Sequence, residues 1–153
     1  LILGEGRFLP GFEKELEACH VYYAKMGMAW LARFYVPKVF TRKGVVYTAR
    51  TYCDYTGFLS DGRAILLEAK SMQKERAWKP DREHQLQMLQ MANRCGALGL
   101  YLVRVGVDVV YLWRPSLEYK FGDKVAWGAC ERIERVYHER PWAWLEKVIE
   151  LGW

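Results

Sequence analysis

Residues 54–70 of the chain read DYTGFLSDGRAILLEAK, and this stretch predicts the β-hairpin around which the fold is built. Aromatic and small apolar residues come first, the Ser-Asp-Gly-Arg segment at 60–63 has the composition of a turn, and an apolar run follows that ends in charge. Because side chains alternate across a strand, Glu68 and Lys70 share one face and Ala69 points to the other. The hairpin therefore presents a carboxylate and an ammonium group side by side.

The length of the turn decides whether Asp54 joins that pair. A three-residue loop over 60–62, with Gly62 in the left-handed conformation, sets Asp54 opposite Glu68. A two-residue turn would instead set Asp54 opposite Ala69, on the wrong face. We expect the longer loop, or a bulge that compensates for the shorter one.

Two carboxylates and a lysine in this arrangement suit the metal-dependent cleavage of a phosphodiester. Asp54 and Glu68 supply the hard oxygen ligands that Mg²⁺ prefers, and a metal so held lowers the pKa of a bound water and neutralises charge on a phosphate. Lys70 would orient that water or stabilise the transition state. The alternative is an edge strand whose last residues are simply solvated. Four apolar residues before Glu68 favour a site, because a solvated strand would alternate.

Two predicted helices bring further polar residues toward this site. Glu13 lies beside the apolar stripe of a helix that opens at residues 11–12, and Gln85 extends the stripe of a helix that opens within residues 80–86. A polar residue at a buried position needs a partner, and Lys70 or a metal-bound water would serve for Gln85. The two stripes are Phe12, Leu16, Cys19, Tyr23 and Met26 in the first helix, and Leu89, Ala92 and Cys95 in the second.

The order of these motifs along the chain resembles that of the PD-(D/E)XK nuclease superfamily, whose α/β fold is restriction-endonuclease-like. Within that superfamily the chain looks like the RecU-type Holliday-junction resolvases, and the resemblance covers roughly residues 11–113. The segments that carry it are Gly11-Phe12-Glu13, Asp54-Tyr55-Thr56-Gly57, Glu68-Ala69-Lys70-Ser71 and His84-Gln85.

The resemblance implies a structure-selective endodeoxyribonuclease that resolves Holliday junctions by paired symmetric nicks in DNA recombination and repair. It also implies Mg²⁺, or Mn²⁺ in its place, and a homodimer bound to a four-way DNA junction. The implied catalytic residues are Glu13, Asp54, Glu68, Lys70 and Gln85, and the implied metal-site residues are Glu13, Asp54, Glu68 and Ala69. The alternatives are another PD-(D/E)XK endonuclease, restriction-type or flap-cutting, and a DNA-binding module without catalysis.

Two basic segments are expected to contact DNA. Residues 37–50 carry four cations and no acid around a predicted Lys43-Gly44 turn, and they resemble the projecting stalk of the resolvase family. Its cations would contact phosphates, while Phe40 and Tyr47 would pack on unstacked bases; an ordinary charged hairpin is the alternative. A second basic run over 70–82 would line the DNA path. The predicted DNA contacts are Lys38, Arg42, Lys43, Arg50, Lys74, Arg76 and Lys79.

The remaining sequence completes an α/β fold of one nuclease domain over residues 1–153. A strand at 29–36 and β-rich runs at 98–105 and 107–113 predict, with the hairpin, a central mixed sheet of about five strands flanked by helices. A C-terminal helix is expected over 140–153, with an apolar stripe that includes tryptophan. We expect these tryptophans in the core or in the dimer interface.

Composition agrees with a nucleic-acid partner. The 153 residues carry a net charge of +5 with a pI near 9.0, and 52% of them are hydrophobic, which argues against disorder. No apolar run approaches the roughly 18 residues that span a bilayer, and the first ten residues lack a signal-peptide pattern. We therefore expect a soluble, cytoplasmic protein. The four cysteines show no Cys-x-x-Cys spacing, so buried free thiols are expected rather than zinc ligands.

Overall fold

The computed structural model describes residues 2–3, 7–8, 11–34, 38–47, 53–136 and 139–153. Its strands are β1 (Ile2–Leu3), β2 (Arg7–Phe8), β3 (Ala29–Arg33), β4 (Lys38–Thr41), β5 (Gly44–Tyr47), β6 (Tyr55–Leu59), β7 (Ala64–Met72), β8 (Leu98–Val105), β9 (Val109–Trp113) and β10 (Glu131–Glu134). Its helices are α1 (Phe12–Lys25), α2 (Glu83–Arg94) and α3 (Trp144–Glu150), with a 3-10 turn, η1, at Trp127–Ala129. None of the described helices is long and apolar enough to cross a membrane.

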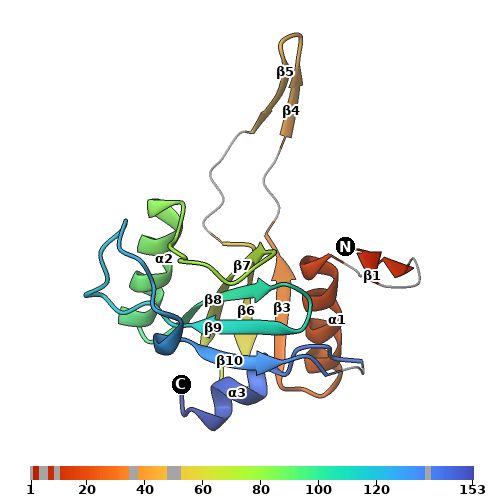
Figure 1. The fold of residues 1–153 in the computed structure, drawn as a ribbon, viewed down its shortest axis with the longest axis vertical. Coiled ribbons are helices and arrows are strands. Elements are labelled where there is room, and N and C mark those ends of the chain that lie inside the picture. The colour runs from red at the N-terminus through yellow and green to blue at the C-terminus, as the bar shows by residue number, and fades with distance from the viewer. Residues whose placement is uncertain (1, 4–6, 9–10, 35–37, 48–52, 137–138) are drawn as a thin grey trace.

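A six-stranded mixed sheet forms the centre of the molecule, in the order β10-β9-β8-β7-β6-β3 (Figure 1). Strands β7 and β8 are parallel and joined by α2, while all other neighbours are antiparallel. The remaining strands form two small two-stranded sheets, β1 with β2 and β4 with β5. The predicted mixed sheet flanked by helices is thus confirmed, with one strand more than expected.

The helices close a hydrophobic core on each face of the sheet. Helices α1 and α3 pack on one face, around Leu16, Tyr23, Leu100 and Trp144, all of which are fully buried. Helix α2 packs on the other face through Leu86 and Leu89, which meet aromatic residues of β8 and β9. Since Glu68 and Lys70 alternate with the buried Leu67, they lie on the face that α2 covers.

Two glycines let neighbouring elements approach closely. A Cβ atom at Gly57 of β6 would lie 1.8 Å from the carbonyl oxygen of Trp30, and one at Gly99 of β8 would lie 2.4 Å from that of Leu89. Any side chain at these two positions would separate β3 from β6, or α2 from the sheet. Both contacts hold elements that position the β6–β7 hairpin.

Several sequence-based boundaries and burial predictions are wrong in detail. The C-terminal helix spans Trp144–Glu150 rather than 140–153, and β10 lies within a segment that has little apolar content. Met26, expected on the apolar stripe of the first helix, is 57% exposed, and Ile149, an apolar residue of the C-terminal helix, is 61% exposed. Cys95 is also exposed, whereas Cys19 and Cys53 are buried thiols as expected.

Candidate active site

The register of the β6–β7 hairpin brings the two predicted carboxylates together. Tyr55 pairs with Leu67 and Phe58 with Ala64, and the Leu59 N–H donates to the Arg63 carbonyl at 2.8 Å. Gly62 has a φ of 87°, as the three-residue loop requires. The predicted loop is confirmed, and the same register continued by one residue sets Asp54 opposite Glu68.

The main chain holds the Asp54 carboxylate in place. The Ala69 N–H donates to Asp54 Oδ2 at 2.8 Å, and the Asp54 N–H donates to the Leu67 carbonyl at 3.0 Å. Burial raises the pKa of Asp54, although the hydrogen bond from Ala69 and the charge of Lys70 oppose that rise. Asp54 is therefore oriented by β7 itself.

Glu68 is a buried carboxylate with an incomplete set of partners. Its side chain is 3% exposed, and Oε1 lies 3.2 Å from Lys70 Nζ. Oε2 is buried and has no hydrogen-bond partner among the described residues. Burial, followed by the charge of Asp54, raises the pKa of Glu68 to about 7. An unsatisfied oxygen beside a second carboxylate is what a divalent cation would complete.

Lys70 is held at the centre of a small polar network. Its Nζ lies 2.9 Å from Asp81 Oδ1 and donates to Gln85 Oε1 at 3.4 Å, in addition to its contact with Glu68. Burial alone would lower the pKa of Lys70, but the hydrogen bond to Asp81 and the charge of Glu68 outweigh it and raise the pKa. Lys70 is therefore cationic and fixed in position, with α2 supplying Gln85 as the sequence predicted.

Glu13 and Ala69 take different positions from the other predicted site residues. The Glu13 carboxylate is 48% exposed and forms an ion pair with Arg33 at 2.6 Å. It lies close enough to contribute to the raised pKa of Asp54. Ala69 packs its side chain against the core, so only its main chain faces the site. Among the described residues, no three His, Cys, Asp or Glu side chains gather as a metal cluster.

The donor set that remains fits one hard divalent cation. Asp54 and Glu68 provide two carboxylates, and Mg²⁺ is typically held by one or two carboxylates while it keeps several waters. The unpartnered Oε2 of Glu68 is the observation that supports such an ion. Glu13 is already paired with Arg33 and is half exposed, so we regard its role as the least direct of the predicted ligands.

The structure adds Asp81 and Arg33 to the residues expected from sequence. Asp81 lies in the segment between β7 and α2 and contacts Lys70, and Arg33 ends β3 beside Glu13. Neither has a motif that sets it apart. Asp81 follows Pro80 as an ordinary helix-preceding acid, and its contact depends on how that segment folds back over β7.

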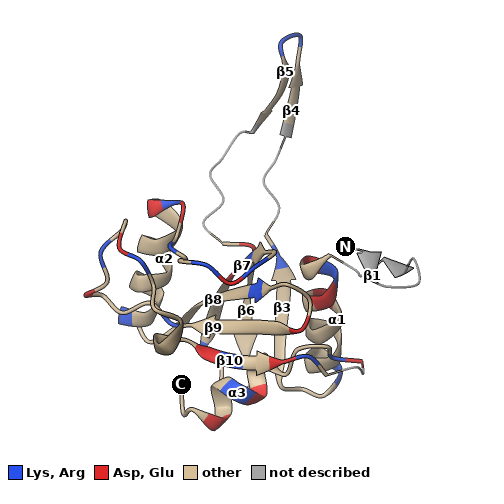
Figure 2. Ribbon diagram, viewed as in Figure 1, with Lys and Arg blue, Asp and Glu red and all other residues tan. Residues whose placement is uncertain are grey.

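The predicted DNA contacts lie in two exposed segments. Arg42 and Lys43 form the two-residue loop of the β4–β5 hairpin, one residue earlier than predicted, and this hairpin stands clear of the main sheet with its cations at the tip (Figures 1 and 2). Phe40 is 82% exposed on the same hairpin. Lys38 lies in β4, and its side chain is outside the described residues, as is all of Arg50.

The second basic segment follows β7 directly. Its three predicted contacts, Lys74, Arg76 and Lys79, are exposed. Trp78 between them is buried among aromatic residues, and its main chain bridges to Val125. The segment therefore presents cations to solvent from an anchored backbone next to Lys70.

Comparisons with known proteins give a limited result. Neither the models of known protein families nor the curated proteins contain a match to this sequence. Among solved structures, the chain is similar to Hjc of Archaeoglobus fulgidus, a Holliday junction resolvase from an archaeal hyperthermophile. The identity is 11%, the TM-score is 0.46, and the match covers 84% of this chain and 91% of that chain. We therefore base the functional proposal on the residues of the site.

The contacts of Lys70 predict a large loss of cleavage when Lys70 is replaced and a smaller loss when Asp81 is replaced. If Lys70 acts on the transition state, Lys70→Ala should slow cleavage of bound DNA by about a hundredfold or more and leave affinity nearly unchanged. Asp81→Asn should give a smaller loss of the same kind, since Gln85 and Glu68 still hold the ammonium group. Single-turnover cleavage and a binding titration measure the two effects. A loss confined to binding would make Lys70 a phosphate contact.

Proposed function

We propose that the chain is a metal-dependent endodeoxyribonuclease that resolves four-way DNA junctions by paired symmetric nicks. The observation that carries the proposal is the buried, half-satisfied carboxylate of Glu68, opposite Asp54 and beside a fixed Lys70. A merely solvated strand end would not bury a carboxylate with an unpartnered oxygen, because that arrangement costs stability. Such a cost is typical of a site kept for function.

The residues of the site have distinct roles in this proposal. Asp54 and Glu68 would hold Mg²⁺, which when bound supplies an activated water and neutralises charge on the scissile phosphate. The Ala69 N–H keeps Asp54 aimed at that position. Lys70 donates to the phosphate or to the attacking water, and Asp81 and Gln85 keep its ammonium group in place.

Selection of a branched substrate is assigned to the exposed cations. The tip of the β4–β5 hairpin carries Arg42 and Lys43 with Phe40 beside them, and an exposed ring can stack on bases that are unpaired at a branch point. Resolution without a residual flap needs two nicks at symmetric positions. Two copies of the chain, each with one site, are the simplest arrangement that meets this need.

The decisive experiment compares three DNA substrates at equal salt. A four-way junction, a flap and a linear duplex are incubated with the protein and Mg²⁺, with chelator controls. Paired cuts confined to the junction are expected. Preferential cutting of the flap or the duplex would favour another nuclease of the same superfamily, and Mg²⁺-dependent binding without cutting of any substrate would favour a DNA-binding module.

The hairpin tip gives a separate prediction. Arg42 and Lys43 replaced together by alanine should weaken junction binding and reduce the slope of log affinity against log salt by up to about two charges. The nicking rate at saturating protein should stay near wild type, because neither residue contacts the carboxylates. Titrations at several salt concentrations test this. Asp61→Asn and Lys25→Ala, exposed changes away from the hairpin, serve as controls.

A further inference from the structure

The two edges of the central sheet are built differently. Strand β10 carries the sequence ERIE, and its outward charges protect an edge against pairing with another strand. Strand β3, at the opposite edge, reads AWLAR, and it has no proline, no bulge and no charge before its last residue. None of the described strands pairs with its outer side. Such an edge is a template for a further strand.

The hydrogen-bond pattern shows which main-chain groups that edge presents. The Phe34 N–H donates to the Asp54 carbonyl, and the Ser60 N–H donates to the Met28 carbonyl. Because hydrogen-bonded pairs alternate along an antiparallel ladder, the even-numbered residues of β3 face β6. Ala29 and Leu31 therefore direct their main-chain groups outward.

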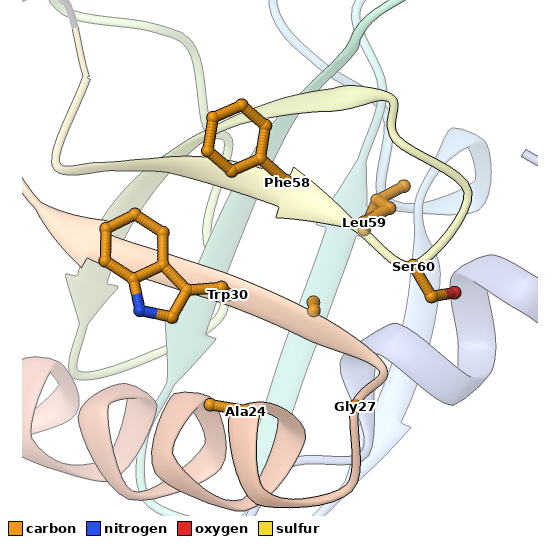
Figure 3. Close-up of a pocket in the computed structure, with 7 residues that line it drawn as sticks. Ala24, Gly27, Trp30, Phe58, Leu59 and Ser60 are labelled. Carbon is orange, nitrogen blue, oxygen red and sulfur yellow. The ribbon is translucent and has the colours of Figure 1, made fainter.

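Apolar side chains surround this edge and leave hollows beside it. Figure 3 shows Trp30 of β3 and Phe58 of β6 side by side, and they stack at 6.3 Å between ring centroids while each remains more than half exposed. A hollow of about 360 Å³ lies between α1 and β3, lined by Val21, His20, Leu31 and others. Val21 on its helical wall is 70% exposed. Ala29 and Leu31 of β3 pack toward α1, so Trp30 and Phe58 lie on the opposite face of the sheet. A strand added to β3 would therefore have Val21 beside it on one face and Trp30 on the other.

We propose that the outer edge of β3, together with Val21 of α1 and the Trp30–Phe58 pair, is the surface on which a second copy of this chain docks. The two β3 strands would pair antiparallel about a two-fold axis near Leu31, so that one sheet runs through both copies. This inference rests on the proposed function for its need of two sites, but the edge itself is an independent observation.

A second copy fits this edge for reasons of symmetry and charge. An antiparallel pair of identical strands is two-fold symmetric, so the outward main-chain groups of β3 in one copy pair with the same groups in the other. The single charge of β3, on Arg33, is paired with Glu13 at 2.6 Å and Glu17 at 3.6 Å, so neither strand brings an unpaired arginine to the interface. The buried tryptophans near the C-terminus, by contrast, belong to each copy's own core and are not available for docking.

Two variants and two matched controls test the surface by sedimentation at micromolar concentration. Leu31→Pro removes an outward N–H without touching the ladder to β6, and Leu31→Ala loses the same side chain but keeps that N–H. Val21→Lys places a charge on α1 beside the hollow next to β3, and Ile149→Lys introduces the same charge at an exposed position on α3. We expect a wild-type dimer, retained in both controls, and a dimer dissociation constant raised by about tenfold or more in the two test variants.

The nuclease readout separates this inference from the proposed function. Val21→Lys should keep Mg²⁺-dependent nicking of single strands of the junction and lose the coupling of the two cuts. A wild-type monomer, with and without junction DNA, or dimers that persist in both test variants would overturn the β3 interface. A wild-type dimer that responds to the variants but cuts no DNA would defeat the proposed function and support the interface. If Leu31→Pro does not fold, Val21→Lys against Ile149→Lys decides.

Discussion

Asp54→Asn and Glu68→Gln are each expected to reduce cleavage of a four-way junction by about a thousandfold or more, while junction binding persists. Metal-ion stabilisation of a phosphoryl transition state is worth several kcal/mol, and each 1.36 kcal/mol changes the rate tenfold. Affinity for DNA comes mainly from cation contacts to phosphates, which these changes leave in place. Single-turnover cleavage in Mg²⁺ and a gel-shift titration measure the two quantities.

Matched controls for these variants lie on the same elements. Asp61→Asn changes an exposed acid in the turn of the β6–β7 hairpin, and Glu83→Gln changes an exposed acid at the start of α2. Both should cut at the wild-type rate. Full activity in either site variant would remove the carboxylates from the mechanism, and a parallel loss of binding would indicate a folding defect instead.

Glu68→Gln, which should reduce cleavage, is expected to increase the stability of the fold relative to wild type near neutral pH. The pKa of Glu68 is raised to about 7 in the folded protein by burial and by the charge of Asp54, from an ordinary value of 4.5. A group of this kind favours the folded state below its unfolded pKa and loses that contribution as pH rises through the folded pKa. In chelator, the wild type should therefore lose stability relative to Glu68→Gln between about pH 4.5 and 7, as urea denaturation at several pH values would show.

Glu15→Ala is expected to destabilise the fold by about 3–5 kcal/mol, the usual cost of removing one partner of a buried ion pair. Glu15 Oε1 lies 2.6 Å from Arg104 Nη1, and Oε2 forms an ion pair with Arg135. All three side chains are less than a tenth exposed, and the Trp142 indole N–H donates to Glu15 Oε1 at 3.4 Å. Alanine would leave two buried guanidiniums without their shared carboxylate.

Urea denaturation measures this loss, with Glu134→Ala as the control. Glu134 forms an exposed ion pair with Arg132 at 2.7 Å, and exposed pairs contribute about 0–1 kcal/mol. A cost below about 1 kcal/mol for Glu15→Ala would mean that the two arginines find other partners or water when the carboxylate is removed.

The β6–β7 hairpin could be predicted because its register depends on residues close together in the sequence. Alternation with period two and a glycine at the third loop position fix which face Asp54 and Glu68 occupy, and the register confirms it. Strand β10 was missed because three of its four residues are charged, which is not typical of a strand. It forms through its pairing with β9, which lies about twenty residues earlier in the sequence. Gln85 was found by its place on an apolar stripe.

The parts that sequence reasoning missed depend on long-range packing. Asp81 reaches Lys70 only because the segment before α2 folds back over β7. The composition of that segment does not predict this path. Glu15 looks like one of several acids at the start of α1, yet it is 3% exposed and pairs with Arg104 of β8 and with Arg135, which follows β10. Trp142 and Trp144, which were expected in the core or in the dimer interface, lie in the core, where α3 packs against α1.

The anchoring of Trp78 has a consequence for the thermodynamics of DNA binding. Its ring lies 5.4 Å from the rings of both Tyr101 and Trp113, so the backbone that carries Lys74, Arg76 and Lys79 is ordered when the protein folds. A flexible basic loop would lose main-chain entropy each time it bound a phosphate, and that loss would reduce the affinity. In this protein most of that entropic loss occurs on folding instead. If the chain binds DNA as proposed, side-chain ordering is then the main conformational cost of phosphate contact beside Lys70.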